Sequence, residues 1–356
     1  MSARLAAVLL AACAAGGCAS LADRIIAPPD QAARLGAADA GPALGIGRSR
    51  LQVADGITLA YRTVPVATRA LRYRYRRNAR VFALDFDAAP TTPPVAPPPL
   101  RGTVIYLHGW GFDGSSMLPW ALALAQQGYA GIAVDLRGHG GSSRAPEGFG
   151  PREAGDIVAL VDRLRAKGSL AEPVYLFGVS YGASAALFAE RGLRGRIAGI
   201  VAMEPFANAA DAIRTMVPAL RREDATRPFA RAMSALTRRR YDAAAVERAI
   251  AETNRRLGLD LDAIDLREPL AQSCTCTLLL HGARDTWLPV AGARRLARAA
   301  PDARYLELPD ENHLSLPLRI DWLAAPVAAW LQQAGTGRCE GLVLPPDPAG
   351  VLPAAR

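Results

Sequence analysis

Short apolar runs alternate with longer segments of helical character from residue 103 onward. The runs are rich in Val, Ile, Leu and Ala and have the length of buried strands. The expected strands cover residues 103–107, 131–134, 174–177, 197–203, 277–280 and 304–308, and the expected helices cover 117–127, 152–166, 183–190, 291–299 and 321–333. Repeated strand–helix units predict an α/β fold whose central sheet is mostly parallel and carries helices on both faces.

A hairpin pattern precedes this alternation. Leu51–Val53 and Ile57–Val64 are strand-like and flank Asp55-Gly56, a pair that favours a tight turn. We expect this antiparallel hairpin at one edge of the sheet.

An arginine-rich strand pattern follows the hairpin. Apolar or aromatic residues alternate with arginines over Leu71–Arg76, which places Leu71, Tyr73 and Tyr75 on one face, and 81–86 is a further strand. Arginines occupy six positions between residues 69 and 80, with no acidic residue among them. The arginines predict a solvated sheet face, and a contact for anionic lipid head groups is the alternative.

The strand rhythm stops between Phe206 and Glu268, where the sequence is helical in character. This interruption predicts a helical cap that is inserted into the α/β core and covers the functional site. The sequence predicts a signal peptide over residues 1–18 and a flexible tether over 19–47. An α/β core follows in two parts, 48–206 and 269–334, with the cap over 207–268 between them. A C-terminal tail covers 335–356.

Composition adds little about partners. The chain has 356 residues, 51% of them hydrophobic, and a formal net charge of +9. All the basic residues except Lys167 are arginines, and Ala, Gly and Pro are abundant, so a GC-rich genome is the simplest source of the charge. No basic helix or nucleic-acid motif stands out, which excludes nucleic acid as an expected partner.

The N-terminus is typical of a targeting segment. Arg4 precedes a short apolar stretch over residues 5–15, which is too short for a mature membrane-spanning helix. Small residues then precede Cys18, as in a bacterial lipoprotein signal whose cysteine is lipidated. Cys13 lies closer to Arg4 and is a poorer candidate, and cleavage as an ordinary secretory signal near Ser20 is the alternative. Each of these readings places the mature protein in the bacterial cell envelope or outside it.

Three further cysteines follow. In an oxidising compartment Cys339 could pair with Cys274 or Cys276, and free or buried thiols are the alternative. Cys-x-Cys without further ligands predicts no metal site.

Gly178-Val179-Ser180-Tyr181-Gly182 carries the strongest chemical signal. It lies between an expected strand and an expected helix, which is the setting of a nucleophile elbow. A serine hydroxyl needs a base to accept its proton, and that base needs an orienting carboxylate.

The base and the acid come from loops that follow strands. Of the histidines, His313 follows the last expected strand and is the best base, whereas His108, His139 and His281 favour structural roles. Asp285 follows the strand over 277–280 and completes the chain order serine, acid, histidine.

Glu204 and two backbone groups complete the expected site. Glu204, after the strand over 197–203, is the alternative acid. The backbone N–H groups of Trp110 and Tyr181 are expected to form the oxyanion hole, because one follows the first parallel strand and the other starts a helix.

Five motifs in this order resemble the α/β-hydrolase superfamily over about residues 50–333, and more loosely its serine aminopeptidase, monoacylglycerol lipase and esterase branches. They are His108-Gly109-Trp110-Gly111, 135–140, 178–182, 281–285 and Asn312-His313. The resemblance implies the α/β-hydrolase fold and a serine hydrolase that cleaves carboxylic esters. It implies no cofactor and no metal.

Two other functions stay open at this stage. One is an aminopeptidase or amidase, which would need an acidic subsite such as Glu204. The other is a non-catalytic binding protein of the envelope. The expected partners are a small ester or lipid-like substrate and a membrane reached through an anchor at Cys18. Leaving group, acyl chain length and oligomeric state are not indicated.

Overall fold

The computed structural model describes residues 3–6, 20–27, 41–78, 82–224, 242–300 and 302–351. Cys13 and Cys18 lie outside the described residues.

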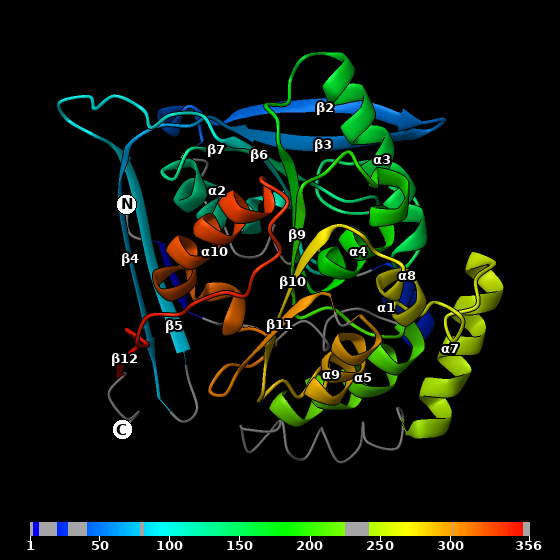
Figure 1. The fold of residues 1–356 in the computed structure, drawn as a ribbon. Coiled ribbons are helices and arrows are strands. Elements are labelled where there is room, and N and C mark those ends of the chain that lie inside the picture. Colours follow the sequence, from blue (N-terminus) through cyan, green and yellow to red (C-terminus); the bar gives the residue numbers. More distant parts are fainter. Residues whose placement is uncertain are drawn as a thin grey trace.

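An eight-stranded sheet forms the centre of the molecule (Figure 1). Its strands are β2 (Gly47–Ala54), β3 (Ile57–Val64), β6 (Gly102–Leu107), β7 (Tyr129–Val134), β8 (Val174–Val179), β9 (Gly199–Met203), β10 (Cys276–Gly282) and β11 (Arg304–Leu308). The order is β11-β10-β9-β8-β6-β7-β3-β2. The strands from β11 to β7 run parallel, and β3 and β2 are antiparallel at one edge. The expected mostly parallel sheet with an edge hairpin is confirmed.

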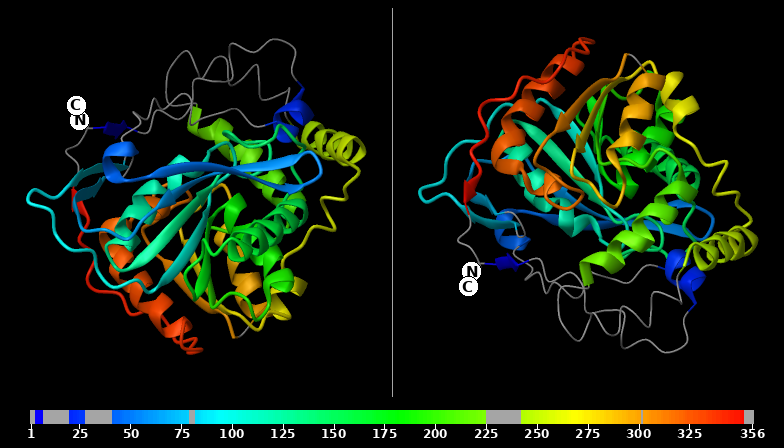
Figure 2. Two further views of the ribbon diagram at one scale, coloured as in Figure 1. Left: turned by 90° about the horizontal axis from the view of Figure 1, so that it is seen from above. Right: turned by 90° about the horizontal axis from the view of Figure 1, so that it is seen from below.

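Helices cover both faces of this sheet, as expected. The central strands β6 and β8 are buried along their whole length, because helices pack on both sides of them. One face packs against α2 (Leu118–Ala125) and α10 (Ile320–Ala334). The other face packs against α3 (Pro151–Ala166) and α4 (Tyr181–Leu193). Two views from above and below show the helices on either side of the twisted sheet (Figure 2).

The remaining helices are shorter or lie further from the sheet. They are α1 (Leu21–Ile26), α5 (Ala209–Asp224), α7 (Ala243–Leu257), α8 (Arg267–Ala271) and α9 (Val290–Ala299), with 3₁₀ turns at Pro42–Leu44, Gly114–Met117 and Leu316–Leu318. No helix in the described ranges is both long and apolar enough to cross a bilayer.

Part of the predicted tether is a folded helix, α1, rather than a flexible segment. Ser20 and Asp23 form a capping box at the start of α1, and Ala22 and Ile25 are buried in the core. The helix packs against α7, where Asp23 pairs with Arg256. The prediction of a flexible tether over residues 19–47 is therefore wrong for α1, because its apolar side is covered by α7.

The arginine-rich strand belongs to a second, smaller sheet. Its order is β1-β5-β4-β12, formed by β1 (Ala3–Ala6), β5 (Phe82–Pro90), β4 (Arg69–Arg77) and β12 (Gly350–Val351). Tyr75 is buried on the inner face, as the alternation predicts. Arg69 and Arg77 lie an even number of residues from Tyr75, so they share this face, where both donate hydrogen bonds.

Acidic residues of β5 partly balance the arginines on the outer face of β4. Arg72 lies opposite Asp87 and Arg74 lies opposite Asp85. Asp85 also pairs with Arg76. This arrangement favours the solvated face over an anionic-lipid contact, because acidic residues of the same sheet offset part of the positive charge.

The C-terminal tail is fastened to the fold by a disulfide. Cys276, at the start of β10, is bonded to Cys339, with the Cα atoms 5.0 Å apart. Cys339 therefore pairs with one of its two expected partners, and Cys274 is exposed and free.

Candidate active site

Ser180 occupies a strained turn between β8 and α4. Its φ of 52° and ψ of −115° lie outside the regions that L-residues ordinarily adopt. The neighbouring backbone leaves room only for glycine at the positions two residues before and two residues after Ser180. A Cβ on Gly182 would lie 2.2 Å from the carbonyl oxygen of Leu107, and one on Gly178 would lie 2.4 Å from the carbonyl oxygen of Gly182. The Gly-x-Ser-x-Gly pattern thus has a steric cause, and strain of this kind is typical of functional sites.

The structure brings Ser180, His313 and Asp285 together from three loops at the carboxyl ends of strands. Nε2 of His313 lies 2.9 Å from Oγ of Ser180, and Nδ1 lies 2.7 Å from Oδ2 of Asp285. Oδ1 of Asp285 accepts hydrogen bonds from the backbone N–H groups of Trp287 and Leu288, each at 2.8 Å. These contacts leave the lone pair of Nε2 directed at the serine hydroxyl.

Asp285 is held as a carboxylate. Burial raises its pKa, but the charge of His313 and the hydrogen bond between the two side chains outweigh burial and keep the pKa below its usual range. The ring of Trp287 packs on the His313 ring, with centroids 5.1 Å apart. The ring of His313 is therefore oriented both by a carboxylate and by an aromatic ring.

The backbone groups expected to stabilise an oxyanion lie next to this serine. Tyr181 is the first residue of α4, where the helix dipole favours negative charge. Trp110 follows Gly109, and a Cβ on Gly109 would lie 3.6 Å from the Cβ of Ser180. The loop after β6 and the start of α4 therefore flank the nucleophile.

Two buried imidazoles fasten the loop that carries Trp110. The N–H of Gly111 donates to Nε2 of His139 at 3.2 Å, and the N–H of Leu136 donates to Nε2 of His108 at 3.0 Å. Burial lowers the pKa of His108 to about 3, so its ring stays uncharged near neutrality. His108 and His139 thus have the structural roles that their glycine-rich surroundings predict.

Glu204, the alternative acid, lies behind Asp285 rather than against the base. Its Oε1 accepts a hydrogen bond from the N–H of Gly282 at 3.0 Å, and its Oε2 lies 3.0 Å from Nδ1 of His281. Burial, together with the charge of Asp285, raises the pKa of Glu204 well above its usual range. The carboxyl hydrogen-bonded to His313 is that of Asp285.

Glu204, His281 and Asp285 form the candidate metal-ligand group among the described residues. One donor atom each from Glu204, His281 and Asp285 falls within 4.8 Å of the others. Oδ2 of Asp285 is already used by His313 and Oδ1 by two backbone N–H groups. A metal there would compete with His313 for Asp285, so we do not assign the cluster to a metal.

Glu147 is a buried carboxyl that the sequence did not reveal. Its Oε1 lies 3.3 Å from Nε2 of His139, and its side chain contacts that of Trp110. Burial, together with the charge of Glu153, raises the pKa of Glu147 well above its usual range. The contact with the Trp110 side chain joins Glu147 to the loop that carries Trp110. No motif marks Glu147, because it lies in an irregular loop.

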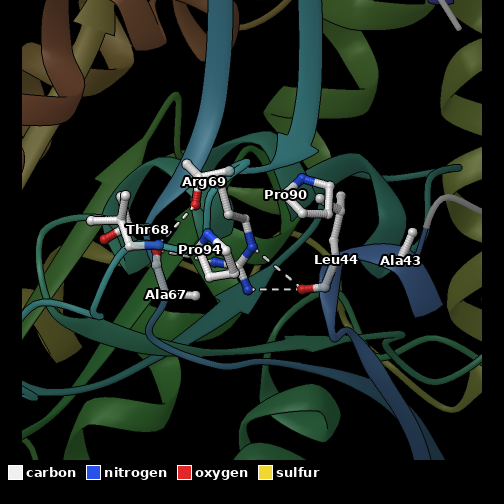
Figure 3. A pocket seen from close by; sticks show the side chains of 9 residues that line it. Ala43, Leu44, Ala67, Thr68, Arg69, Pro90 and Pro94 are labelled. Carbon is white, nitrogen blue, oxygen red and sulfur yellow. Dashed lines mark hydrogen bonds between the residues drawn. The ribbon is translucent and has the colours of Figure 1, made fainter.

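A surface depression lies at a different place on the molecule, between the start of the fold and the second sheet (Figure 3). It is lined by Ala43, Leu44, Ala67, Thr68, Arg69, Pro90, Thr91, Pro94 and Val95. Arg69 donates hydrogen bonds to the carbonyl oxygens of Leu44 and Pro65 (Figure 3 shows the former). Arg69 thus joins β4 to the segments around Leu44 and Pro65. The depression includes no residue of the candidate triad.

Known structures share the architecture at low sequence identity. An esterase from Exiguobacterium antarcticum is 17% identical with a TM-score of 0.52, covering 80% of this chain and 99% of that chain. 2,6-Dihydroxy-pseudo-oxynicotine hydrolase is 19% identical with a TM-score of 0.56, covering 86% and 73%. A thermophilic esterase from Thermogutta terrifontis is 19% identical with a TM-score of 0.50, covering 81% and 99%. At these identities the likeness shows the fold alone.

The sequence comparisons name the family. No curated protein sequence matches the chain. A model described as the alpha/beta hydrolase family matches residues 104–326, which is more than half of the chain and includes the elbow and both loops of the candidate triad. The chain therefore belongs to the alpha/beta hydrolase family.

Proposed function

We propose that this protein hydrolyses carboxylic esters through an acyl-enzyme formed on Ser180. The observation that carries the proposal is the continuous contact from Ser180 Oγ through His313 to Asp285, at 2.9 and 2.7 Å. Membership in the alpha/beta hydrolase family supports a hydrolytic reaction. We assign the chain to the esterase and lipase-like part of that family.

The geometry supports a two-step reaction. Oγ of Ser180 attacks the ester carbonyl carbon while Nε2 of His313 takes the hydroxyl proton. The N–H groups of Trp110 and Tyr181 stabilise the oxyanion, and Asp285 stabilises the imidazolium. Collapse breaks the bond to the alcohol, which leaves with the proton from His313. Water, activated by the same histidine, then attacks the acyl-enzyme and releases the acid.

Amide cleavage at a free N-terminus is the second candidate, and the surroundings of Glu204 speak against it. An aminopeptidase needs an acidic group that can reach the substrate ammonium. Glu204 has no exposed surface and already contacts Gly282 and His281. A buried carboxyl whose pKa is raised also lacks the charge that an ammonium would seek. Non-catalytic binding would fit better if one triad member were missing.

Replacing the nucleophile tests the proposal. We expect Ser180→Ala to abolish hydrolysis of short p-nitrophenyl esters, with Ser49→Ala, an exposed serine on β2, as the control that keeps parental activity. A fluorophosphonate probe should label the parent at Ser180, as mapped by mass spectrometry. Equal esterase activity in Ser180→Ala and the parent would contradict the mechanism. A folded parent that takes no label would favour a binding protein.

The targeting segment leads to a separate proposal on location. We infer that Cys18 is lipidated and that the mature protein is attached to a membrane of the bacterial cell envelope. The small residues before Cys18 support this, and the Cys276–Cys339 disulfide fits an oxidising compartment. Cys18→Ser should move the protein from the membrane fraction to the soluble fraction, and retention of the variant on membranes would contradict lipidation.

A further inference from the structure

Two segments outside the repeating strand–helix units meet beside the loop of His313. One is β4 of the small sheet, and the other is the C-terminal tail, residues 335–351. The tail runs past α10 and ends as β12, which pairs with β4 through Gly350 opposite Arg76 (Figure 1). The point where they meet lies next to the catalytic base.

Glu311, two residues before His313, is contacted directly by β4 and is linked to the tail through arginines. The residue has no exposed surface. Its Oε1 accepts hydrogen bonds from Arg77 of β4, at 2.7 Å, and from Arg319 before α10. Its Oε2 accepts from the hydroxyl of Ser315 at 2.6 Å. Glu311 therefore holds both ends of the short loop that presents His313.

The backbone of Glu311 also contacts the loop of the catalytic acid. Its carbonyl oxygen accepts a hydrogen bond from the N–H of Arg284 at 2.9 Å, and Arg284 directly precedes Asp285. A Cβ on Gly282 would lie 2.4 Å from that carbonyl oxygen, so the approach is as close as the chain permits. A shift of Glu311 would consequently move the base relative to the acid.

Asp347 of the tail secures the two arginines from the opposite side. Its carboxylate pairs with Arg77 at 3.1 Å and also with Arg319. Arg319 has no exposed surface and lies between the rings of Tyr75 and Trp322, at 4.5 and 4.7 Å from their centroids. A buried guanidinium group needs acceptors for its N–H groups, and carboxylates are the strongest of these. Asp347 and Asp321 both pair with Arg319, so Asp347 helps to fix the donors that Glu311 accepts.

A disulfide and two indoles hold the tail at this position. Cys339 is bonded to Cys276 at the base of β10, the strand that leads to Asp285. The indole N–H of Trp322 donates to the carbonyl oxygen of Pro345 at 2.8 Å, and that of Trp330 donates to the carbonyl oxygen of Glu340 at 3.0 Å.

We propose that the C-terminal tail is a brace for the catalytic histidine, in which Asp347 is a positioning residue and the Cys276–Cys339 disulfide is the fastening. The tail acts through Arg77 and Arg319 on Glu311, and so on the distance between His313 and Ser180. Reduction of the disulfide releases the tail and weakens catalysis. The inference depends on the proposed role of His313 as the base.

The first test compares two acid-to-amide variants of the tail. Asp347→Asn keeps the shape of the side chain and removes its charge. Glu340→Gln makes the same change at an exposed residue whose side chain pairs with Arg338 and whose backbone contact to Trp330 the change retains. We expect kcat of Asp347→Asn on a p-nitrophenyl ester to fall about 10-fold with KM almost unchanged, because the substrate site is intact and the base is misplaced. Glu340→Gln should keep the parental kcat.

Hydrogen exchange separates positioning from plain stabilisation. In Asp347→Asn, backbone amides of residues 311–316 should exchange faster, whereas those of β6 should keep their parental protection. A fall in Tm with kcat unchanged would overturn the brace, and so would equal losses of kcat in the two amide variants.

The second test uses the disulfide and does not depend on the folding of Asp347→Asn. Dithiothreitol at a concentration that frees both thiols, as measured by thiol titration, should lower kcat of the parent about as much as Cys339→Ser does. Cys339→Ser itself should not respond to dithiothreitol. A parent with both thiols free and full kcat would overturn the inference.

The outcome also separates this inference from the proposed function. A parent that fluorophosphonate does not label at Ser180 would overturn both. A labelled, active parent whose kcat is insensitive to Asp347→Asn and to reduction would overturn the brace alone.

Discussion

Asp285→Asn should disable the base while leaving its position intact. In the parent, Oδ1 accepts two backbone hydrogen bonds, from Trp287 and Leu288, and Oδ2 accepts from Nδ1 of His313. In the variant the amide oxygen stays with the two backbone N–H groups, because the amide nitrogen would meet two donors there. The NH₂ group then faces Nδ1 of His313. Nδ1 must become the acceptor, which moves the imidazole proton to Nε2, where it blocks transfer from Ser180.

The size of the loss follows from the changed tautomer. The hydroxyl of Ser180 no longer finds a lone pair at 2.9 Å, and the imidazolium loses its carboxylate. We expect kcat to fall by ~10⁴-fold, which is about 5 kcal/mol in the activation barrier. Stability should change much less, because the side chains have the same shape and the cluster loses a buried charge.

Esterase kinetics over a pH series would check this expectation. Asp55→Asn, in the exposed turn between β2 and β3, is the control and should keep the parental kcat. Circular dichroism and thermal unfolding should confirm that Asp285→Asn is folded. A folded variant that loses less than about 10-fold in kcat would refute the assignment of the acid and return attention to Glu204.

Three further changes test the elbow and the second carboxyl. Ser180→Gly and Ser180→Ala should both be inactive, but the glycine variant should be more stable by about 1 kcal/mol in chemical denaturation, because glycine tolerates a φ of 52°. The opposite order would argue against backbone strain. Gly182→Ala should lower the free energy of unfolding by about 1–3 kcal/mol, whereas Gly155→Ala, whose Cβ meets nothing within 4 Å, should be neutral or stabilising. The pKa of Glu204 is raised in the folded protein, so the stability from its proton is full below the unfolded pKa and is lost as pH rises toward the folded pKa. Glu204→Gln should therefore gain Tm relative to the parent between about pH 4 and pH 7, and a pH-independent difference would contradict a protonated Glu204.

Local sequence was sufficient for most of the fold and for the choice of Ser180 as the candidate nucleophile. Short apolar runs predict buried strands, and the expected parallel strands correspond to β6 through β11. The elbow was identifiable from five residues, because a strained turn between strand and helix requires glycine on both sides of Ser180. His313 and Asp285 could be chosen because each follows a strand, and parallel strands bring their carboxyl ends to one edge.

Tertiary structure decided the choices among equivalent groups. Both Asp285 and Glu204 follow strands that end near the site, and only the folded loops put Asp285 against His313 and Glu204 against His281. Cys339 had two possible partners, and the position of the tail selects Cys276. These selections depend on distances between residues far apart in the chain, on which local periodicity carries no information.

The tail and the inward arginines also show which features the sequence determines and which the tertiary structure decides. Alternation places Arg77 on the same face of β4 as Tyr75. Only the folded structure shows that the buried carboxylate of Glu311 meets its charge there. Nothing in the tail's own sequence marks Asp347, which gains its contacts because the disulfide and β12 bring it to Arg319. The sequence by itself determined the sheet, the elbow and the order of the candidate triad, since these follow from residues close together in the chain. The folded structure alone decided which charges meet, because a buried charge is stable only beside a partner that folding supplies.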